Sequence, residues 1–107
     1  MSGKKKLIRQ NFRDSVFRRD GNKCVLCGQT ENLDVHHITD RNLMPFGGYV
    51  KENGISLCPD HHEMAESYHH SNGEEYAEGF HPKQLYMKIG SSFEKAQKAS
   101  MRLERHG

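Results

Sequence analysis

The chain has 107 residues, of which 34% are hydrophobic and 28% charged, and it contains no Trp. So few apolar side chains give one small domain a thin core, and such domains usually depend on disulfides, a metal or a partner. No apolar run approaches the roughly 20 residues of a transmembrane helix, and the basic N-terminus lacks the apolar stretch of a signal peptide. We therefore expect a cytoplasmic, intracellular protein whose three cysteines act as thiolate ligands and do not form a disulfide framework.

Charge is distributed unevenly along the chain. Residues 1–23 contain eight basic and two acidic residues, a net charge of +6, whereas the remainder contains eight basic and twelve acidic residues, a net charge of −4. A basic arm on a mildly acidic body is typical of attraction to a phosphate backbone. A solvated tail that only aids solubility would have the same composition.

The N-terminal half is expected to alternate between one helix and two short strands. Residues 1–7 are predicted to be a disordered basic tail, and a helix is predicted over 8–20 because its apolar residues fall on one stripe. A turn at Gly21 and Asn22 ends that helix. A tight knuckle over 24–28, a strand over 33–38, a long connection over 39–52 and a second strand over 54–57 follow.

The C-terminal half is expected to be helical. One helix is predicted from residue 59 or 60 to about Tyr68, a polar loop over 69–80, and a short helix over 82–89. Ser91 and Ser92 cap a last helix. The apolar side chains of this half are predicted to cap the small core. Four of its histidines are expected to be exposed: His69, His70, His81 and His106.

Two close pairs of metal-ligand residues stand on either side of the predicted strands. Cys24-x-x-Cys27 and Cys58-x-x-His61 are separated by 30 residues, which leaves room for a hairpin between them. Tetrahedral zinc prefers such paired sulfur and nitrogen donors, so the sequence predicts a structural zinc site. His62 is an alternative fourth ligand, and three unrelated buried cysteines would be the alternative to any metal.

Histidines form a second group of candidate functional residues. His36 and His37 are adjacent on a predicted strand, so their side chains point to opposite faces and cannot serve one ion in the same way. This arrangement favours one imidazole that coordinates a metal and one that acts on water near pH 7. His62 follows the zinc knuckle directly, and Asn53 can bridge backbone groups and hold the loop beside the base.

The segment 18–66 resembles an HNH endonuclease. The likeness lies in four stretches: Arg19-Asp20-Gly21-Asn22-Lys23-Cys24-Val25-Leu26-Cys27-Gly28, Leu33-Asp34-Val35-His36-His37-Ile38, Asn53-Gly54-Ile55-Ser56-Leu57-Cys58 and Cys58-Pro59-Asp60-His61-His62. The resemblance implies an α+β fold with a small ββα-metal (His-Me finger) core, a zinc knuckle, an N-terminal helix and a C-terminal helical extension. It implies a nuclease domain over 8–70, with 71–107 packed on it.

The resemblance also implies roles. His36 would be the first ligand of a catalytic divalent ion and His62 the second, with Glu66 as an added ligand one helical turn later. His37 would be the general base, and Asn53 the orienting asparagine. His36 stands where many family members have Asp.

The zinc ligands implied by the resemblance are Cys24, Cys27, Cys58 and His61, where His61 replaces the usual cysteine. The catalytic ion stays open between Mg²⁺, Mn²⁺, Ni²⁺ and Zn²⁺.

The implied reaction is hydrolysis of a DNA phosphodiester. His37 would take a proton from the attacking water, and the products would carry a 5′ phosphate and a 3′ hydroxyl. Arg18, Arg19 and Lys23 are expected to hold the backbone of a DNA duplex.

Two other functions fit part of the pattern. A zinc-stabilised nucleic-acid-binding module without catalysis needs the cysteine cluster but not His36, His37, Asn53 and His62 together. A zinc-folded protein-interaction domain leaves the basic first helix unexplained. The target sequence and the choice between monomer and homodimer are not determined, and a phage or mobile-element role is suggested by analogy alone.

Overall fold

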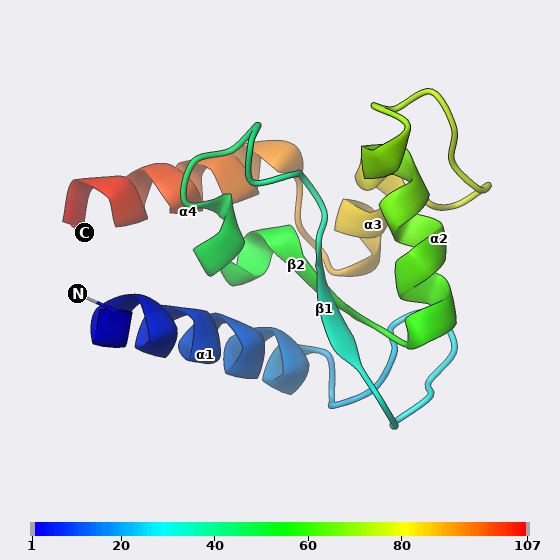
Figure 1. Cartoon of the computed structure of the whole chain (residues 1–107), viewed down its shortest axis with the longest axis horizontal. Helices are drawn as coiled ribbons and strands as arrows, with labels where there is room; N and C mark the ends of the chain where they lie inside the picture. The colour runs from blue at the N-terminus through cyan, green and yellow to red at the C-terminus, as the bar shows by residue number, and fades with distance from the viewer. Residues whose placement is uncertain (1, 107) are drawn as a thin grey trace.

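The computed structural model describes the backbone of residues 2–106 and the side chains of residues 9–104. A two-stranded antiparallel hairpin lies between helices (Figure 1). The described elements are α1 (Ser2–Arg19), β1 (Asp34–His37), β2 (Gly54–Leu57), α2 (Pro59–His70), α3 (Pro82–Lys88) and α4 (Phe93–His106), with two short 3₁₀ turns, η1 (Gly47–Tyr49) and η2 (Lys51–Asn53). This small α+β architecture confirms the predicted fold class.

The two faces of the hairpin are covered by different helices. Val35 packs against α1 in a small buried cluster with Phe12, and the His37 ring stacks on the same Phe12. His36 points to the other face, toward α2. The alternation of side chains along a strand thus sends the two adjacent imidazoles into separate environments, as the sequence predicts.

Gly54 allows α1 to lie close to the hairpin. It pairs with His37 across the two strands. A Cβ at Gly54 would lie 2.8 Å from Phe12 Cζ and 2.8 Å from Val16 Cγ2, which is closer than carbon atoms normally approach. Gly54 therefore allows α1 to pack closely on β2, and this packing also sets the surroundings of His37.

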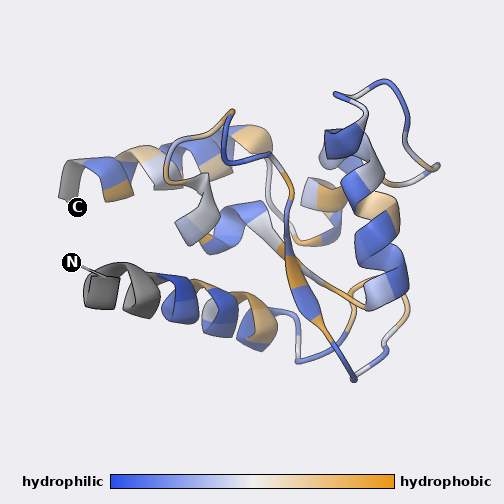
Figure 2. Cartoon of the chain, in the orientation of Figure 1, coloured by the Kyte–Doolittle hydropathy of each residue, from blue (hydrophilic) through white to orange (hydrophobic). Residues whose placement is uncertain are grey.

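The main core lies on the α2 side of the hairpin and continues into the C-terminal helices. Ile38, Ile55 and Leu57 are fully buried there. Leu85 and Tyr86 of α3 and Ala96 of α4 belong to the same cluster, so these helices pack on the core. The strands include hydrophobic residues, whereas both ends of α2 are hydrophilic (Figure 2).

Some element bounds differ from the prediction. Helix α1 begins at Ser2, so the backbone of residues 2–7 is helical where a disordered tail was expected, and α2 continues to His70. The side chains of residues 1–8 and 105–107, including that of His106, lie outside the described residues. No helix in the described part of the chain is long and apolar enough to cross a bilayer.

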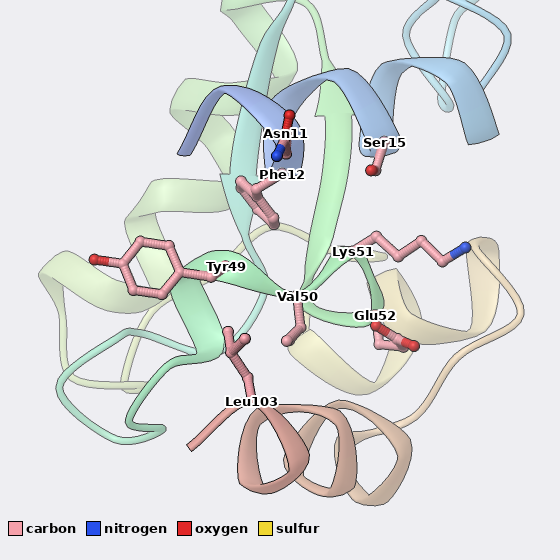
Figure 3. Close-up of a pocket in the computed structure, with 8 residues that line it drawn as sticks. All are labelled: Asn11, Phe12, Ser15, Tyr49, Val50, Lys51, Glu52 and Leu103. Carbon is pink, nitrogen blue, oxygen red and sulfur yellow. The ribbon is translucent and has the colours of Figure 1, made fainter. Parts of the chain in front are cut away.

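A surface hollow of about 370 Å³ lies where α1, the two 3₁₀ turns and α4 meet (Figure 3). Its lining residues are Asn11, Phe12, Ser15, Tyr49, Val50, Lys51, Glu52 and Leu103. None of them is a cysteine or a histidine, so the residues that the sequence marks for chemistry lie elsewhere.

Candidate metal centre and active site

The predicted zinc ligands converge. The ligand atoms of Cys24, Cys27, Cys58 and His61 all lie within 4.8 Å of one another. Cys27 Sγ lies 3.8 Å from Cys58 Sγ, and His61 Nδ1 lies 3.2 Å from Cys58 Sγ and 3.6 Å from Cys24 Sγ. Tetrahedral zinc with ordinary bond lengths separates two sulfurs by about 3.8 Å and a sulfur from a nitrogen by about 3.5 Å. The four residues therefore fit one zinc ion.

Local backbone geometry brings the two halves of this cluster together. In the first half, the Gly28 amide donates to the Cys24 carbonyl, and Gly28 has a φ of 80°, which a glycine adopts without strain. In the second half, Cys58 is the N-cap of α2 and Pro59 occupies its first turn, where proline is favoured. In each half, the two residues between the ligands thus form a turn that places both ligand side chains on the same side of the backbone.

The charge state of Cys24 suits metal binding. Burial raises the pKa of this thiol, but hydrogen bonds from the backbone amides of Cys58, Leu26 and Cys27 together outweigh it and lower the pKa to about 6. A thiolate is the form that binds zinc. The fourth donor of the cluster is His61, and His62 faces the other cluster, which resolves the alternative left open by the sequence.

The second group consists of His36, His62 and Glu66. Glu66 Oε1 lies 3.1 Å from His36 Nδ1 and 3.1 Å from His62 Nε2. Neighbouring ligands of one ion with bonds of about 2.1 Å lie about 3.0–3.4 Å apart, depending on the coordination geometry. Two imidazoles and one carboxylate at this spacing fit one divalent ion, and they leave other positions of that ion free.

The protonation states in this group also suit a metal. His36 is 1% exposed, and its burial lowers its pKa to about 4. Burial raises the pKa of Glu66, but its contacts with His36 and His62 outweigh that effect and lower it. Neutral imidazoles and an ionised carboxylate are the forms that coordinate metal ions.

Two further residues support this group. Asp34 Oδ2 lies 3.6 Å from His62 Nδ1, on the ring edge opposite the nitrogen that faces Glu66. His69 stacks on His36 with ring centroids 5.1 Å apart, and its Nε2 lies 2.8 Å from the His37 carbonyl oxygen. The prediction that His69 is exposed is therefore wrong. Its spacing of seven from His62 places both on one helix face, which is the sequence signal that identifies it.

His37 lies on the opposite face of β1. Its ring stacks on Phe12 with centroids 5.3 Å apart and an interplanar angle of 16°. Its Nε2 is buried and has no hydrogen-bond partner among the described residues. Burial lowers the pKa of His37 and outweighs the opposing effect of the Gly48 backbone, and the positive charge of Arg41 acts in the same direction as burial. A neutral imidazole with an unused nitrogen has the properties of a general base.

Asn53 connects β2 to the loop after β1. It is fully buried, its Oδ1 accepts from the Thr39 amide at 2.8 Å, and its Nδ2 donates to the carbonyls of Thr39 and Gly47 at 2.9 and 3.1 Å. Tyr86, which the sequence analysis interpreted only as a packing residue that caps the core, donates its hydroxyl to Asn53 Oδ1 at 2.7 Å. Asn53 thus holds the loop that follows His37, as a positioning residue.

Replacing Asn53 by Ala is expected to destabilise the protein by more than about 3 kcal/mol, because several buried polar groups lose their partner and each costs about 1–3 kcal/mol. Tyr86→Phe should cost less, about 1–3 kcal/mol, because Asn53 keeps its backbone partners while the buried Thr39 hydroxyl loses the Tyr86 oxygen. Urea unfolding of the two zinc-loaded variants measures the difference. Equal stability of Asn53→Ala and the parent protein would contradict this role.

The predicted DNA contacts and exposed histidines have mixed outcomes. Arg18 and Lys23 are exposed. Arg19 is partly buried and donates to Asp20 and to the carbonyls of Lys51 and Gly54, so its guanidinium is already used within the protein. His81 was expected to be exposed, but it is half-buried and caps α3 by accepting from the Lys83 amide. His70 is exposed, as expected.

Comparison with known proteins agrees with the resemblance. A family model described as HNH endonuclease matches residues 24–71, which contain both groups of metal-ligand residues, His37 and Asn53. Neither the curated proteins nor the solved structures give a match. Residues 24–71 of this chain are therefore similar to the HNH endonuclease family.

Proposed function

We propose that the protein is a metal-dependent DNA endonuclease. The observation that carries the proposal is the unpartnered Nε2 of His37 on one face of β1, with the His36, His62 and Glu66 group on the other face. Similarity of the matched segment to a nuclease family supports the same activity. In this proposal the nuclease unit spans residues 8–70, and residues 71–107 form an extension on its core.

The proposed reaction is a direct hydrolysis. His37 accepts a proton from water as the water oxygen attacks phosphorus, and the bond from phosphorus to the 3′ oxygen breaks. The products carry a 5′ phosphate and a 3′ hydroxyl. A divalent ion held by His36, His62 and Glu66 would supply positive charge near the developing phosphorane. Asn53 keeps the loop after β1 in place, and Arg18 and Lys23 contribute contacts to the DNA backbone.

The zinc cluster has a structural role in this proposal. A cysteine-rich set of four ligands leaves no position open for substrate, so zinc there folds the domain and positions α2. Thiolate ligands persist in a reducing compartment, which supports a location inside the cell.

His62→Ala is expected to weaken catalytic-ion binding by more than about 100-fold. Even mutation of a residue that only hydrogen-bonds to a metal ligand lowers metal affinity by about 10–100-fold. Plasmid nicking at low Mn²⁺ should be lost and should return in part at high Mn²⁺. Zinc content should stay at one per chain, because His61 and not His62 faces the cysteines.

Glu63→Ala is the matched control, because Glu63 is an exposed carboxylate on the same helix. Normal nicking by His62→Ala at low Mn²⁺ would contradict the proposed site. A parent protein that binds DNA but cleaves nothing would favour the non-catalytic zinc-stabilised binding module.

A further inference from the structure

A small cavity adjoins the free nitrogen of His37. Its volume is about 130 Å³. We call it the arginine pocket, and its lining residues are Arg9, Phe12, Arg13, Val35, His37, Arg41 and Gly48. Three guanidinium side chains therefore border one cavity, and they come from two segments, α1 and the loop after β1.

The positive charge of the arginine pocket is only partly balanced. Arg13 donates to Asp34 Oδ1 at 2.8 Å, whereas Arg9 and Arg41 form no ion pair within residues 9–104. Asp40, the neighbouring acid, accepts from the Asn42 amide in its own turn. Arg9 and Arg13 are also four residues apart on one helix, where like charges repel. An arrangement that opposes local stability in this way is typical of a binding site.

Arg41 is held close to His37 by a glycine. A Cβ at Gly48 would collide with Arg41 Cδ and would lie 3.5 Å from His37 Nε2. The absence of that carbon lets the Arg41 stem cross the backbone beside the imidazole. Arg41 and the free nitrogen of His37 thus border the same small volume.

The pocket is connected to the metal-ligand group through side chains. Arg13 pairs with Asp34, and Asp34 Oδ2 lies 3.6 Å from His62 Nδ1. An anion in the pocket would therefore adjoin His37, and Arg13 and Asp34 would connect it to His62.

We propose that the arginine pocket binds a phosphate of the DNA backbone, with Arg9 and Arg41 as its donors and Arg13 as the link to Asp34. The assignment rests on the proposed nuclease function and deepens it by naming the residues that seat the phosphate. Guanidinium groups match phosphate oxygens in geometry and charge. The cavity volume of about 130 Å³ leaves room for a phosphate group.

The test measures binding separately from cleavage. A fluorescent DNA duplex of arbitrary sequence is titrated with zinc-loaded protein, with no second divalent ion, at several salt concentrations. Arg9→Gln and Arg41→Gln are each expected to weaken binding about 10-fold or more and to reduce the salt slope by about 0.9. Arg102→Gln is the matched comparison, because Arg102 is an exposed arginine of α4 that belongs to none of the proposed DNA contacts.

The outcomes separate the pocket from the nuclease activity. Larger losses for Arg9→Gln and Arg41→Gln than for Arg102→Gln support the pocket, even where the parent protein fails to cleave plasmid and the proposed function fails. Equal losses for all three variants, or no duplex binding by the parent protein, would overturn it. So would plasmid cleavage by the parent protein combined with unchanged binding by Arg41→Gln.

Discussion

Removal of zinc from the cysteine cluster is expected to unfold the domain. Structural zinc contributes an apparent binding free energy of about 10–16 kcal/mol near pH 7, whereas a typical domain is stable by about 5–15 kcal/mol in total. The buried core here is small, and Cys24 and Cys58 are themselves part of it. Little folding free energy therefore remains without the ion.

Titration with a zinc chelator tests this prediction: circular dichroism follows the helical signal, and the zinc released per chain is measured in the same sample. His61→Ala should lose both zinc and helical signal. His61→Cys should keep both, because it supplies a fourth thiolate in place of the imidazole. A zinc-free protein with the full helical signal and a cooperative thermal transition would show that the cluster does not fold the domain.

Replacement of His37 is expected to have the largest effect on activity. A general base contributes about 10²–10⁴-fold to rate, so His37→Ala should lower single-turnover cleavage by that factor. Duplex binding should change little, because the imidazole is neutral near pH 7 and adds no positive charge to the pocket. The lowered pKa of His37, which its burial causes, keeps it in that neutral form.

Loss of the Phe12 stack could also affect the fold of His37→Ala, so its zinc content and unfolding midpoint are measured alongside. His37→Gln keeps a side chain of similar size and should be equally inactive. Glu63→Ala serves again as the control, because Glu63 is exposed on α2 and belongs to neither group of ligand residues. Cleavage by folded His37→Gln at the rate of the parent protein would assign the base to another residue.

The sequence predicts the residues whose geometry follows from short spacings. The two residues between the ligands in Cys24-x-x-Cys27 and in Cys58-x-x-His61 form a turn that brings both ligands to one ion. The alternation of side chains along a strand separates His36 from His37. Glu66 follows His62 by one helical turn, which brings both carboxylate and imidazole to one face. In these cases local geometry alone decides which atoms meet.

Contacts between distant segments could not be predicted in this way. Tyr86 reaches Asn53 across 33 residues, and nothing near Tyr86 in the sequence indicates that partner. Arg19 belongs to a basic stretch that is typical of DNA contact, but the approach of α1 to β2 turns its guanidinium onto backbone carbonyls. Arg41 stands alone in a loop, and only folding brings it beside His37 and the arginines of α1.

The most direct test of the nuclease assignment is plasmid cleavage by the parent protein that carries one zinc per chain. Supercoiled DNA is incubated with this protein alone and with added Mg²⁺, Mn²⁺ or Ni²⁺. The account predicts nicked or linear DNA with at least one added ion and intact DNA without it. Intact plasmid with every ion, from folded protein that still binds the duplex, would contradict it.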